Sequence, residues 1–145
     1  MAGYPVVDIR TTVYDGSFHP VDSSDICFKI AGAQALKKGL SQAQPIILEP
    51  IMNLEVTVPE EFTGDIIGDL NTKRARVLGM NPQGKLNTIE AQVPQAEILR
   101  YAIDLKSITQ GRGSFKVEFS HYEETPAQVA QKIIAARQAE KAESK

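Results

Sequence analysis

Hydrophobic and polar side chains alternate along the first part of the chain, over residues 5–13. A repeat of two residues is the signature of a half-buried strand, because successive side chains of a strand point to opposite faces. We therefore predict a strand here, with Asp8, Arg10 and Thr12 on its polar face. The other face carries Val7, Ile9, Thr11 and Val13.

A loop with turn residues follows this segment, and a helical pattern starts after the loop. Asp15-Gly16 is a turn signal, and Asp22 or Ser23 can cap the helix by accepting a hydrogen bond from its free amide groups. Gly39 suits a chain reversal near the end of the helix. The apolar stripe, with residues four positions apart, is Ile26, Ile30, Ala31, Ala35, Leu36 and Leu40. One strand and one helix cannot bury this stripe, so we expect exposed apolar surface.

A small polar segment that ends in proline, residues 41–45, predicts a connector, so that residues 1–44 form a first domain. Residues 46–58 alternate again and predict a long strand with one polar face. The segment 59–61, a proline and two glutamates, is a strong helix start, since proline needs no amide partner there and acids complement the helix dipole. The predicted buried stripe of this helix is Phe62, Ile66, Ile67 and Leu70.

Two shorter strands are predicted at residues 76–80 and 86–93, joined by a loop at 81–84 that contains proline and glycine. Pro94 opens a second helix, and residues 114–121 alternate as a closing strand. The predicted stripe of the second helix is Ile98, Leu99, Ala102, Ile103 and Leu105. The predicted apolar face of the closing strand is Phe115, Val117, Phe119 and His121.

The order strand, helix, strand, strand, helix, strand over residues 45–124 is the ferredoxin-like βαββαβ arrangement. A terminal helix is predicted within residues 125–145, with Thr125 as its cap and Pro126 at its first position. Its apolar stripe is Val129, Ile133 and Ala136. We therefore predict an α+β chain, with an incomplete βα unit, a ferredoxin-like domain and a C-terminal helix.

The composition is that of a globular protein, with 42% hydrophobic and 23% charged residues. The net charge is −2, so any contact with RNA has to be local. The single cysteine, Cys27, excludes an internal disulfide and favours a reducing, cytoplasmic location. No apolar run reaches the length of a membrane-spanning helix, so we expect no membrane partner.

Motifs for nucleotide, metal and catalytic chemistry are absent from the sequence. It contains no phosphate-binding loop with the lysine and hydroxyl residue of GTPases, and the 111–113 segment lacks that lysine and precedes a strand. Two histidines and one cysteine do not form a structural zinc site. His19, Asp22 and Ser23 resemble an acid, base and nucleophile, but they share one short loop without an evident oxyanion donor. We predict no catalytic residues, no metal and no cofactor in this chain.

His19 has a second interpretation. A loop histidine between Phe18 and Pro20 suits stacking on bases and hydrogen bonding to phosphate or ribose. An ordinary surface histidine is the simpler alternative.

Four segments of the chain resemble bacterial elongation factor G, a large GTPase of protein synthesis. They are residues 14–24, 47–52, 64–71 and 109–115. The resemblance implies that residues 1–44 are part of the fourth domain of that family, which is ribosomal protein S5 domain 2-like, and that residues 45–124 are its fifth domain. It also implies that GTP, magnesium and the N-terminal domains that bind them belong to a parent factor outside this chain.

In that family the tip of the fourth domain reaches the decoding centre of the small ribosomal subunit, close to tRNA and mRNA. The resemblance gives RNA-contacting roles at this tip to Ser17, Phe18, His19, Asp22 and Ser23. The fifth domain lies near the sarcin-ricin loop and the stalk base of the large subunit. There the resemblance gives RNA contacts to Gln110, Gly111, Arg112, Gly113 and Ser114.

Chemistry agrees with the second assignment, because glycines allow a close approach of backbone to phosphate and Arg112 supplies a planar, permanently charged fork. Arg74 is assigned to the same surface, with neutralisation of a helix C-terminus as its alternative role.

Other classes of protein stay open. A tetracycline ribosomal-protection factor shares the architecture and differs in its tip loops. A small enzyme centred on His19, or a ferredoxin-like ligand-binding module, needs an internal pocket with convergent polar groups, whereas a convex exposed loop favours RNA.

Overall fold

A computed structural model describes residues 2–21 and 23–143 of the chain. The chain divides into two compact units. One unit is Leu48–Thr125, and the other comprises the residues up to Ile47 together with those from Pro126 onward. Within the described residues no helix is both long and apolar enough to cross a membrane.

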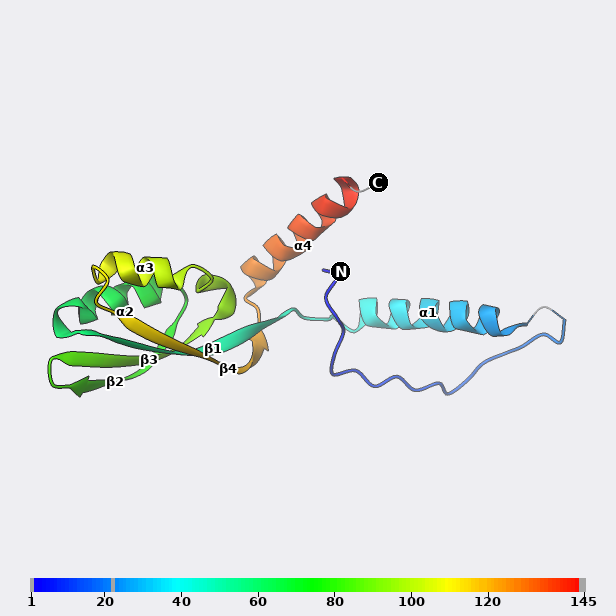
Figure 1. Cartoon of the computed structure of the whole chain (residues 1–145). Helices are drawn as coiled ribbons and strands as arrows, with labels where there is room; N and C mark the ends of the chain where they lie inside the picture. The colour runs from blue at the N-terminus through cyan, green and yellow to red at the C-terminus, as the bar shows by residue number, and fades with distance from the viewer. Residues whose placement is uncertain (1, 22, 144–145) are drawn as a thin grey trace. The chain divides into compact units, whose positions relative to one another are not determined.

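The unit Leu48–Thr125 has the predicted βαββαβ order (Figure 1). Its elements are β1 Leu48–Pro59, α2 Thr63–Thr72, β2 Arg76–Gln83, β3 Leu86–Pro94, α3 Tyr101–Ile108 and β4 Ser114–Glu124. Short 3-10 turns, Glu60–Phe62 and Gln95–Glu97, lead into the two helices from the ends of β1 and β3. The four strands are antiparallel in the order β2-β3-β1-β4, so the α+β, ferredoxin-like prediction is confirmed.

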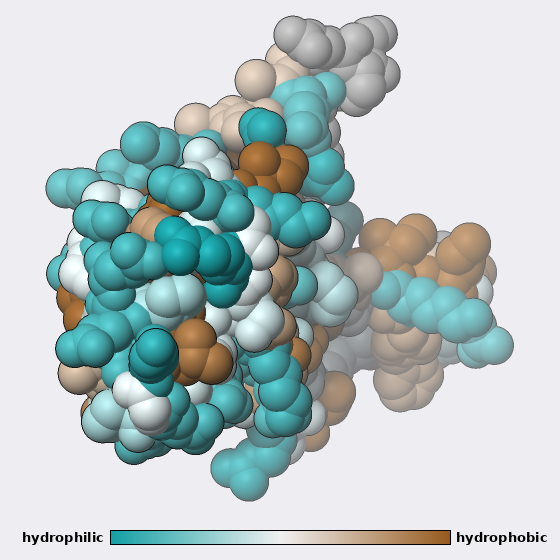
Figure 2. All heavy atoms as spheres, turned by 60° about the vertical axis from the view of Figure 1, so that its left-hand side comes forward, coloured by the Kyte–Doolittle hydropathy of each residue, from teal (hydrophilic) through white to brown (hydrophobic). Residues whose placement is uncertain are grey.

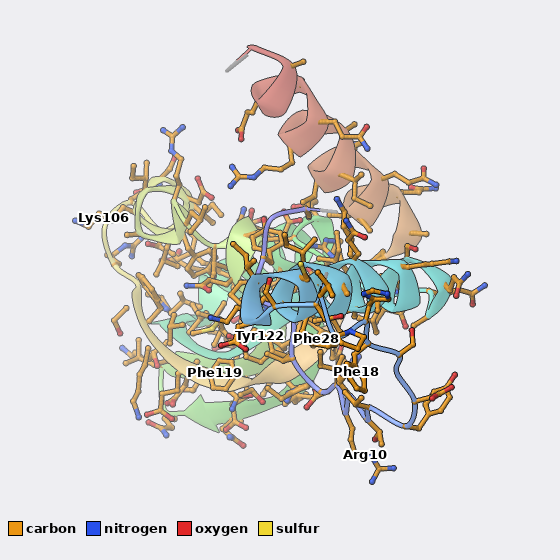
Figure 3. All side chains as sticks on the ribbon, turned by 90° about the vertical axis from the view of Figure 1, so that its right-hand side faces the viewer. Arg10, Phe18, Phe28, Lys106, Phe119 and Tyr122 are labelled. Carbon is orange, nitrogen blue, oxygen red and sulfur yellow. The ribbon has the colours of Figure 1, made fainter. Side chains whose placement is uncertain are left out.

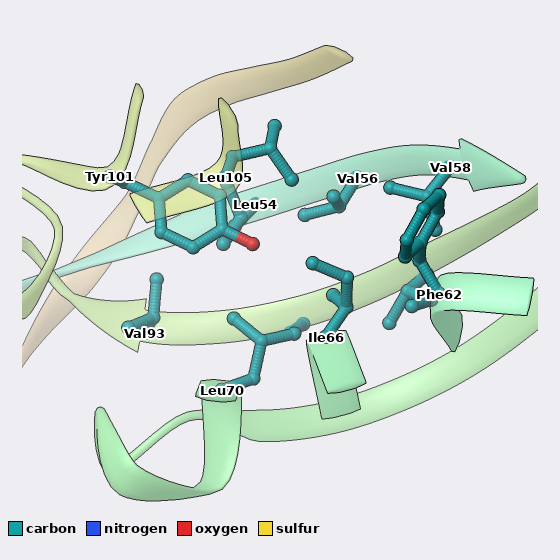
Figure 4. Packing of buried hydrophobic residues seen from close by; sticks show 11 residues of the cluster. Leu54, Val56, Val58, Phe62, Ile66, Leu70, Val93, Tyr101 and Leu105 are labelled. Atoms are coloured by element: carbon teal, nitrogen blue, oxygen red, sulfur yellow. The ribbon is translucent and has the colours of Figure 1, made fainter. Parts of the chain in front are cut away.

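The core of this unit lies between the sheet and the two helices that cover one of its faces (Figure 4). Strand β1 supplies its centre, because alternate residues of β1 point toward the helices. The predicted stripe of α2 is confirmed, with Phe62, Ile66 and Leu70 buried and Ile67 half-buried. The buried cluster is Leu54, Val56, Val58, Phe62, Ile66, Leu70, Ile89, Ala91, Val93, Tyr101 and Leu105.

The hairpin between β2 and β3 is tighter than predicted. Strand β2 continues to Gln83, and the pairing of Gln83 with Leu86 leaves Gly84 and Lys85 as the turn. Gly84 has φ +66°, a conformation that glycine adopts without strain. Pro82 therefore lies in a strand rather than in a loop, which is tolerated because β2 is an edge strand.

The predicted stripe of the second helix is partly wrong. Leu99 and Ile103 are 76% and 58% exposed, whereas Tyr101 and Leu105 are buried. The cause is that α3 starts only at Tyr101, after a 3-10 turn. Its buried face is therefore formed by Tyr101 and Leu105, which are four positions apart.

Strand β4 has a break in register that the sequence pattern did not predict. The pairing with β1 shifts between Ile51 and Met52, which leaves Ser120 as an extra residue between two paired ones. A bulge of this kind changes which face the following residues occupy. Phe119 is 55% exposed on this edge strand and contacts Tyr122, so the predicted apolar face is not a buried one along its whole length (Figure 3).

The other unit contains α1 Asp25–Gln42 and α4 Ala127–Glu143. The strand predicted over residues 5–13 is not formed, and every side chain of this segment is exposed. Asp8 has φ +56°, which interrupts an extended backbone. A strand also needs a hydrogen-bonded neighbour, and no described segment pairs with residues 5–13.

Helix α1 differs from the prediction at both ends. Ser24 rather than Ser23 occupies the N-cap position, without a side-chain capping bond, and Gly39 lies inside the helix. The other predicted cap, Asp22, lies outside the described residues. The expected exposure of apolar surface is confirmed, because α1 buries none of its residues. Its large exposed side chains are Ile26, Phe28, Ile30 and Leu36.

The cap predicted for the terminal helix is wrong. Thr125 is buried, and its Oγ1 has no hydrogen-bond partner among the described residues. The first turn of α4 instead starts from the carbonyl of Pro126, which accepts hydrogen bonds from the amides of Val129 and Ala130.

Candidate nucleic-acid interface

The tip loop between residues 14 and 24 contains an exposed turn held by hydrogen bonds among its own residues. The amide of Ser23 donates to the carbonyl of His19 at 3.1 Å, and the amide of His19 donates to Oγ of Ser23 at 2.6 Å. The amide of Val21 also donates to Nδ1 of His19 at 3.3 Å. Ser17 and His19 are exposed, and Phe18, labelled in Figure 3, is 75% exposed.

This geometry bears on the enzyme alternative for His19. The hydroxyl of Ser23 accepts a hydrogen bond from the backbone amide of His19, so it takes part in the structure of the turn. Asp22, the third member of the set, lies outside the described residues. An aromatic ring and an imidazole on an exposed turn are suited to stacking and hydrogen bonding against a flat partner.

A second loop, between α3 and β4, is held in a fixed conformation by backbone hydrogen bonds. Gln110 and Gly111 have φ +53° and +82°. The amide of Gly111 donates to the carbonyl of Lys106 at 2.9 Å, and the amide of Arg112 donates to the carbonyl of Thr109 at 3.0 Å. The loop therefore presents its outer surface, which includes exposed Gln110, Arg112 and Ser114, from a rigid base.

Gly113 packs against buried side chains at the inner side of this loop. A Cβ at this position would lie 3.1 Å from Cδ1 and Cγ of Leu105 and 3.1 Å from Cγ2 of Thr109. Leu105 and Thr109 are almost fully buried, and Oγ1 of Thr109 donates to the carbonyl of Leu105 at 2.7 Å. A side chain at position 113 would therefore press on buried atoms, which favours glycine here for packing.

Arg112 lies across the first turn that leads into α2. Its Nη1 is 2.7 Å from Oε1 of Glu61, and its guanidinium carbon is 4.7 Å from the ring centroid of Phe62. The side chains of Arg112 and Glu61 are 51% and 59% exposed. A guanidinium carries five N–H donors, so an ion pair through Nη1 leaves further donors for a ligand. Sequence reasoning missed Glu61 and Phe62 as partners of Arg112, because the two segments are far apart in the chain.

Arg74 has a different environment. Its Nη1 and Nη2 donate to both oxygens of Glu49 at 2.8 and 2.9 Å, and its Nε donates to Glu97 at 2.9 Å. The hydrogen bonds with Glu49 raise the pKa of Arg74, burial acts against this, and the hydrogen bond with Glu97 adds to the increase. The guanidinium is engaged by two carboxylates of its own unit, so Arg74 is better explained as a structural residue than as an RNA contact or a helix-end charge.

A row of polar side chains at the β4 bulge was also missed from the sequence. Nδ1 of His121 is 2.8 Å from Oγ of Ser120, and Nε2 is 2.9 Å from Oε1 of Glu123. The hydrogen bond with His121 lowers the pKa of Glu123, while burial opposes this change and the charge of Arg76 adds to it. Near neighbours on one edge strand produce this row, so it is explained by the strand itself and needs no ligand.

The open face of the sheet carries a shallow hollow of about 420 Å³. It is lined by Asn53, Leu54, Glu55, Leu78, Glu90, Ala91, Gln92, Lys116 and Glu118. In Figure 2 the part of the chain nearest the viewer is mainly hydrophilic, with separate hydrophobic areas. Within the described residues no three histidine, cysteine or acidic side chains are grouped to hold a metal ion. A shallow polar hollow lacks the enclosed, largely apolar character of most small-molecule sites.

Two family models match the chain, one after the other. The model described as "Elongation factor G, domain IV" matches residues 1–44, and the model described as "Elongation factor G C-terminus" matches residues 46–133. The chain belongs to the elongation factor G family. Its similarity to that family thus covers both units and both candidate loops.

Individual relatives agree with the family models. Elongation factor G of Aquifex pyrophilus is 52% identical over 141 residues, which are 97% of this chain and 20% of that protein. A crystal structure of a Thermus thermophilus protein matches with a TM-score of 0.73 and 46% identity, over 87% of this chain and 19% of that one. The chain therefore spans about one fifth of the length of these relatives.

Proposed function

We propose that this chain is the RNA-contacting part of a ribosomal translocase of the elongation factor G family. The tip residues Ser17, Phe18, His19, Asp22 and Ser23 contact the decoding centre next to tRNA and mRNA. The loop residues 110–114 contact the sarcin-ricin region of the large subunit, near the stalk base. The parent factor hydrolyses GTP in the cytoplasm, with domains that this sequence does not include.

The observation that carries the proposal is the loop at residues 110–114. Its backbone is fixed by hydrogen bonds, its glycine at 111 exposes backbone, and Arg112 projects from it with half of its side chain exposed. Such a rigid base lowers the entropy lost when a flexible arginine binds a phosphate. We leave Arg74 out of the proposed surface, because Glu49 and Glu97 already engage its guanidinium.

The tip supports the same function through a different interaction. Phe18 is 75% exposed, so packing within this chain does not explain an aromatic residue at this position. Stacking of bases on aromatic rings is a common way to bind single-stranded RNA and depends little on sequence. The chain also lacks a phosphate-binding loop, so its contribution is contact and shape, with no hydrolysis of its own.

Binding of the chain to a synthetic sarcin-ricin RNA hairpin, measured over a range of salt concentrations, tests the proposal. Arg112→Ala should weaken binding about tenfold or more and reduce the slope of log affinity against log salt by about one. Lys116→Ala is the matched control, because Lys116 lines the hollow on the open sheet face and carries the same charge. Equal effects of the two variants, or no salt-dependent binding, would reject the proposal.

A further inference from the structure

Arg112 is held in the free protein by two neighbours of opposite character. Phe62 is 8% exposed, and its ring lies 4.7 Å from the guanidinium carbon. Glu61 is exposed, and its carboxylate forms an ion pair with Nη1 of Arg112 at 2.7 Å. Both neighbours belong to the 3-10 turn Glu60–Phe62, at the end of β1. One contact is therefore buried and apolar, while the other is solvated and ionic.

We propose that Glu61 is an internal competitor for the RNA phosphate that binds Arg112, with Phe62 as the platform that keeps the guanidinium in place. This inference rests on the function proposed above. When a phosphate arrives, it replaces the Glu61 carboxylate at Nη1, while the guanidinium stays over the Phe62 ring. Glu61 then sets how tightly the loop holds RNA.

The exposure of the pair makes such an exchange feasible. The side chains of Arg112 and Glu61 are both more than half exposed, and ion pairs of this kind alter an equilibrium by no more than about fivefold. The contact with Phe62 differs in geometry, because a guanidinium over the face of an aromatic ring keeps the N–H groups at its edge accessible. A phosphate offers the same bidentate geometry as a carboxylate and is accompanied by its neighbours in an RNA chain.

Arg74 illustrates the alternative arrangement within the same unit. Two carboxylates engage three of its nitrogens, and the side chain of Glu49 is only 12% exposed. A phosphate would have to separate a partly buried, bidentate pair to reach Arg74. Because the ion pair of Arg112 with Glu61 is solvated, a phosphate can replace the Glu61 carboxylate.

Glu61→Gln tests the inference, with Glu60→Gln as the matched control. Glu60 is the neighbouring exposed acid of the same turn, so both variants remove one negative charge from the same helix start. With the sarcin-ricin hairpin at low salt, Glu61→Gln should tighten binding about two- to fivefold more than Glu60→Gln does. The difference should vanish in an Arg112→Ala background and decrease as salt is added.

A second measurement needs no RNA. The NMR resonance of the Arg112 Nε–H should shift in Glu61→Gln and stay unchanged in Glu60→Gln, because the ion pair with the guanidinium is made by Glu61. Equal affinities of the two variants, in a protein whose binding depends on Arg112, overturn the competitor role and leave the proposed function intact. Failure of the wild-type chain to bind the hairpin overturns both.

Discussion

Arg74 donates a hydrogen bond to each carboxylate oxygen of Glu49, at 2.8 and 2.9 Å. This pair fastens the end of α2 to the first residues of β1, which are far apart in the sequence. Arg74 has φ +57°, in a position after a helix where glycine is usually favoured. The cost of this backbone conformation is offset by hydrogen bonds that only a guanidinium can make.

Glu49→Gln is therefore expected to destabilise the ferredoxin-like unit by about 1–3 kcal/mol, because an amide cannot replace a bidentate carboxylate. Urea unfolding measures the change. Glu55→Gln on the exposed face of the same strand is the control and should change stability by no more than about 0.5 kcal/mol. Equal effects of the two substitutions would show that the pair with Arg74 contributes nothing.

Gly113→Ala is expected to destabilise the unit by about 1–3 kcal/mol, since the new Cβ would lie 3.1 Å from buried atoms of Leu105 and Thr109. Gly68→Ala provides the contrast, because a Cβ at Gly68 in α2 meets nothing within 4 Å. It should stabilise the unit by about 0.5–1 kcal/mol through helix propensity. Thermal or urea unfolding that ranks the two variants the other way would contradict the packing described for the loop.

Tyr101→Phe is expected to be neutral or stabilising at pH 7, by up to about 1 kcal/mol. The ring of Tyr101 packs edge-on against Phe115, but its buried hydroxyl has no hydrogen-bond partner among the described residues. Removal of such a hydroxyl keeps the packing and avoids the cost of desolvating it. Urea unfolding at pH 7 measures the difference, and a clear loss of stability would mean that the hydroxyl is hydrogen-bonded.

The same residue predicts a pH dependence. Burial, with additional effects of Asp69 and Asp104, raises the pKa of Tyr101 above its ordinary value. The pKa of Tyr101 is higher in the folded than in the unfolded state. The folded state therefore keeps its full stability below about pH 10 and loses stability as the pH rises further and Tyr101 ionises more readily in the unfolded chain. Denaturant unfolding at several alkaline pH values should show wild type losing stability faster than Tyr101→Phe. Equal loss of stability in the two proteins would mean that folding does not raise the pKa of Tyr101.

His19→Ala, made in an elongation factor G that contains this segment, is expected to slow tRNA movement and leave GTP hydrolysis unchanged. The reason is that His19 lies on an exposed turn of a chain without a phosphate-binding loop. Rapid kinetic measurement of both steps tests this, with Gln34→Ala on α1 as a control. A loss of hydrolysis in the histidine variant would contradict the assignment of the tip.

Much of the ferredoxin-like unit follows from local sequence, because Pro59 and Pro94 end strands at positions where a helical turn follows. The features that the local pattern does not predict depend on other segments of the chain or on the exact start of a helix. Residues 5–13 alternate as a strand does, but no described strand pairs with them. Periodicity places Leu99 in the buried stripe of α3, but Leu99 is exposed. A 3-10 turn delays the start of that helix, and such a turn cannot be recognised from periodicity.

The candidate interface was predicted to a different degree at each residue. Arg112 and the glycines of its loop stand out in the sequence, since charge and glycine together suit a phosphate contact. The partners of Arg112 do not stand out, because they lie on another element: the sequence pattern places Glu61 in a helix start and Phe62 in the buried stripe of that helix. Arg74 is assigned to the same surface from the sequence, with a helix-end charge as its alternative role, and only the fold shows that Glu49 and Glu97 engage it.

Chemical probing of purified ribosomes tests the central claim most directly. The chain, added in increasing amounts, should protect nucleotides of the sarcin-ricin loop from modification, and Arg112→Ala should protect them only at much higher concentration. Protection by Lys116→Ala should equal that of wild type. Absence of protection at saturating chain, or equal protection by the Arg112→Ala variant, would contradict the account.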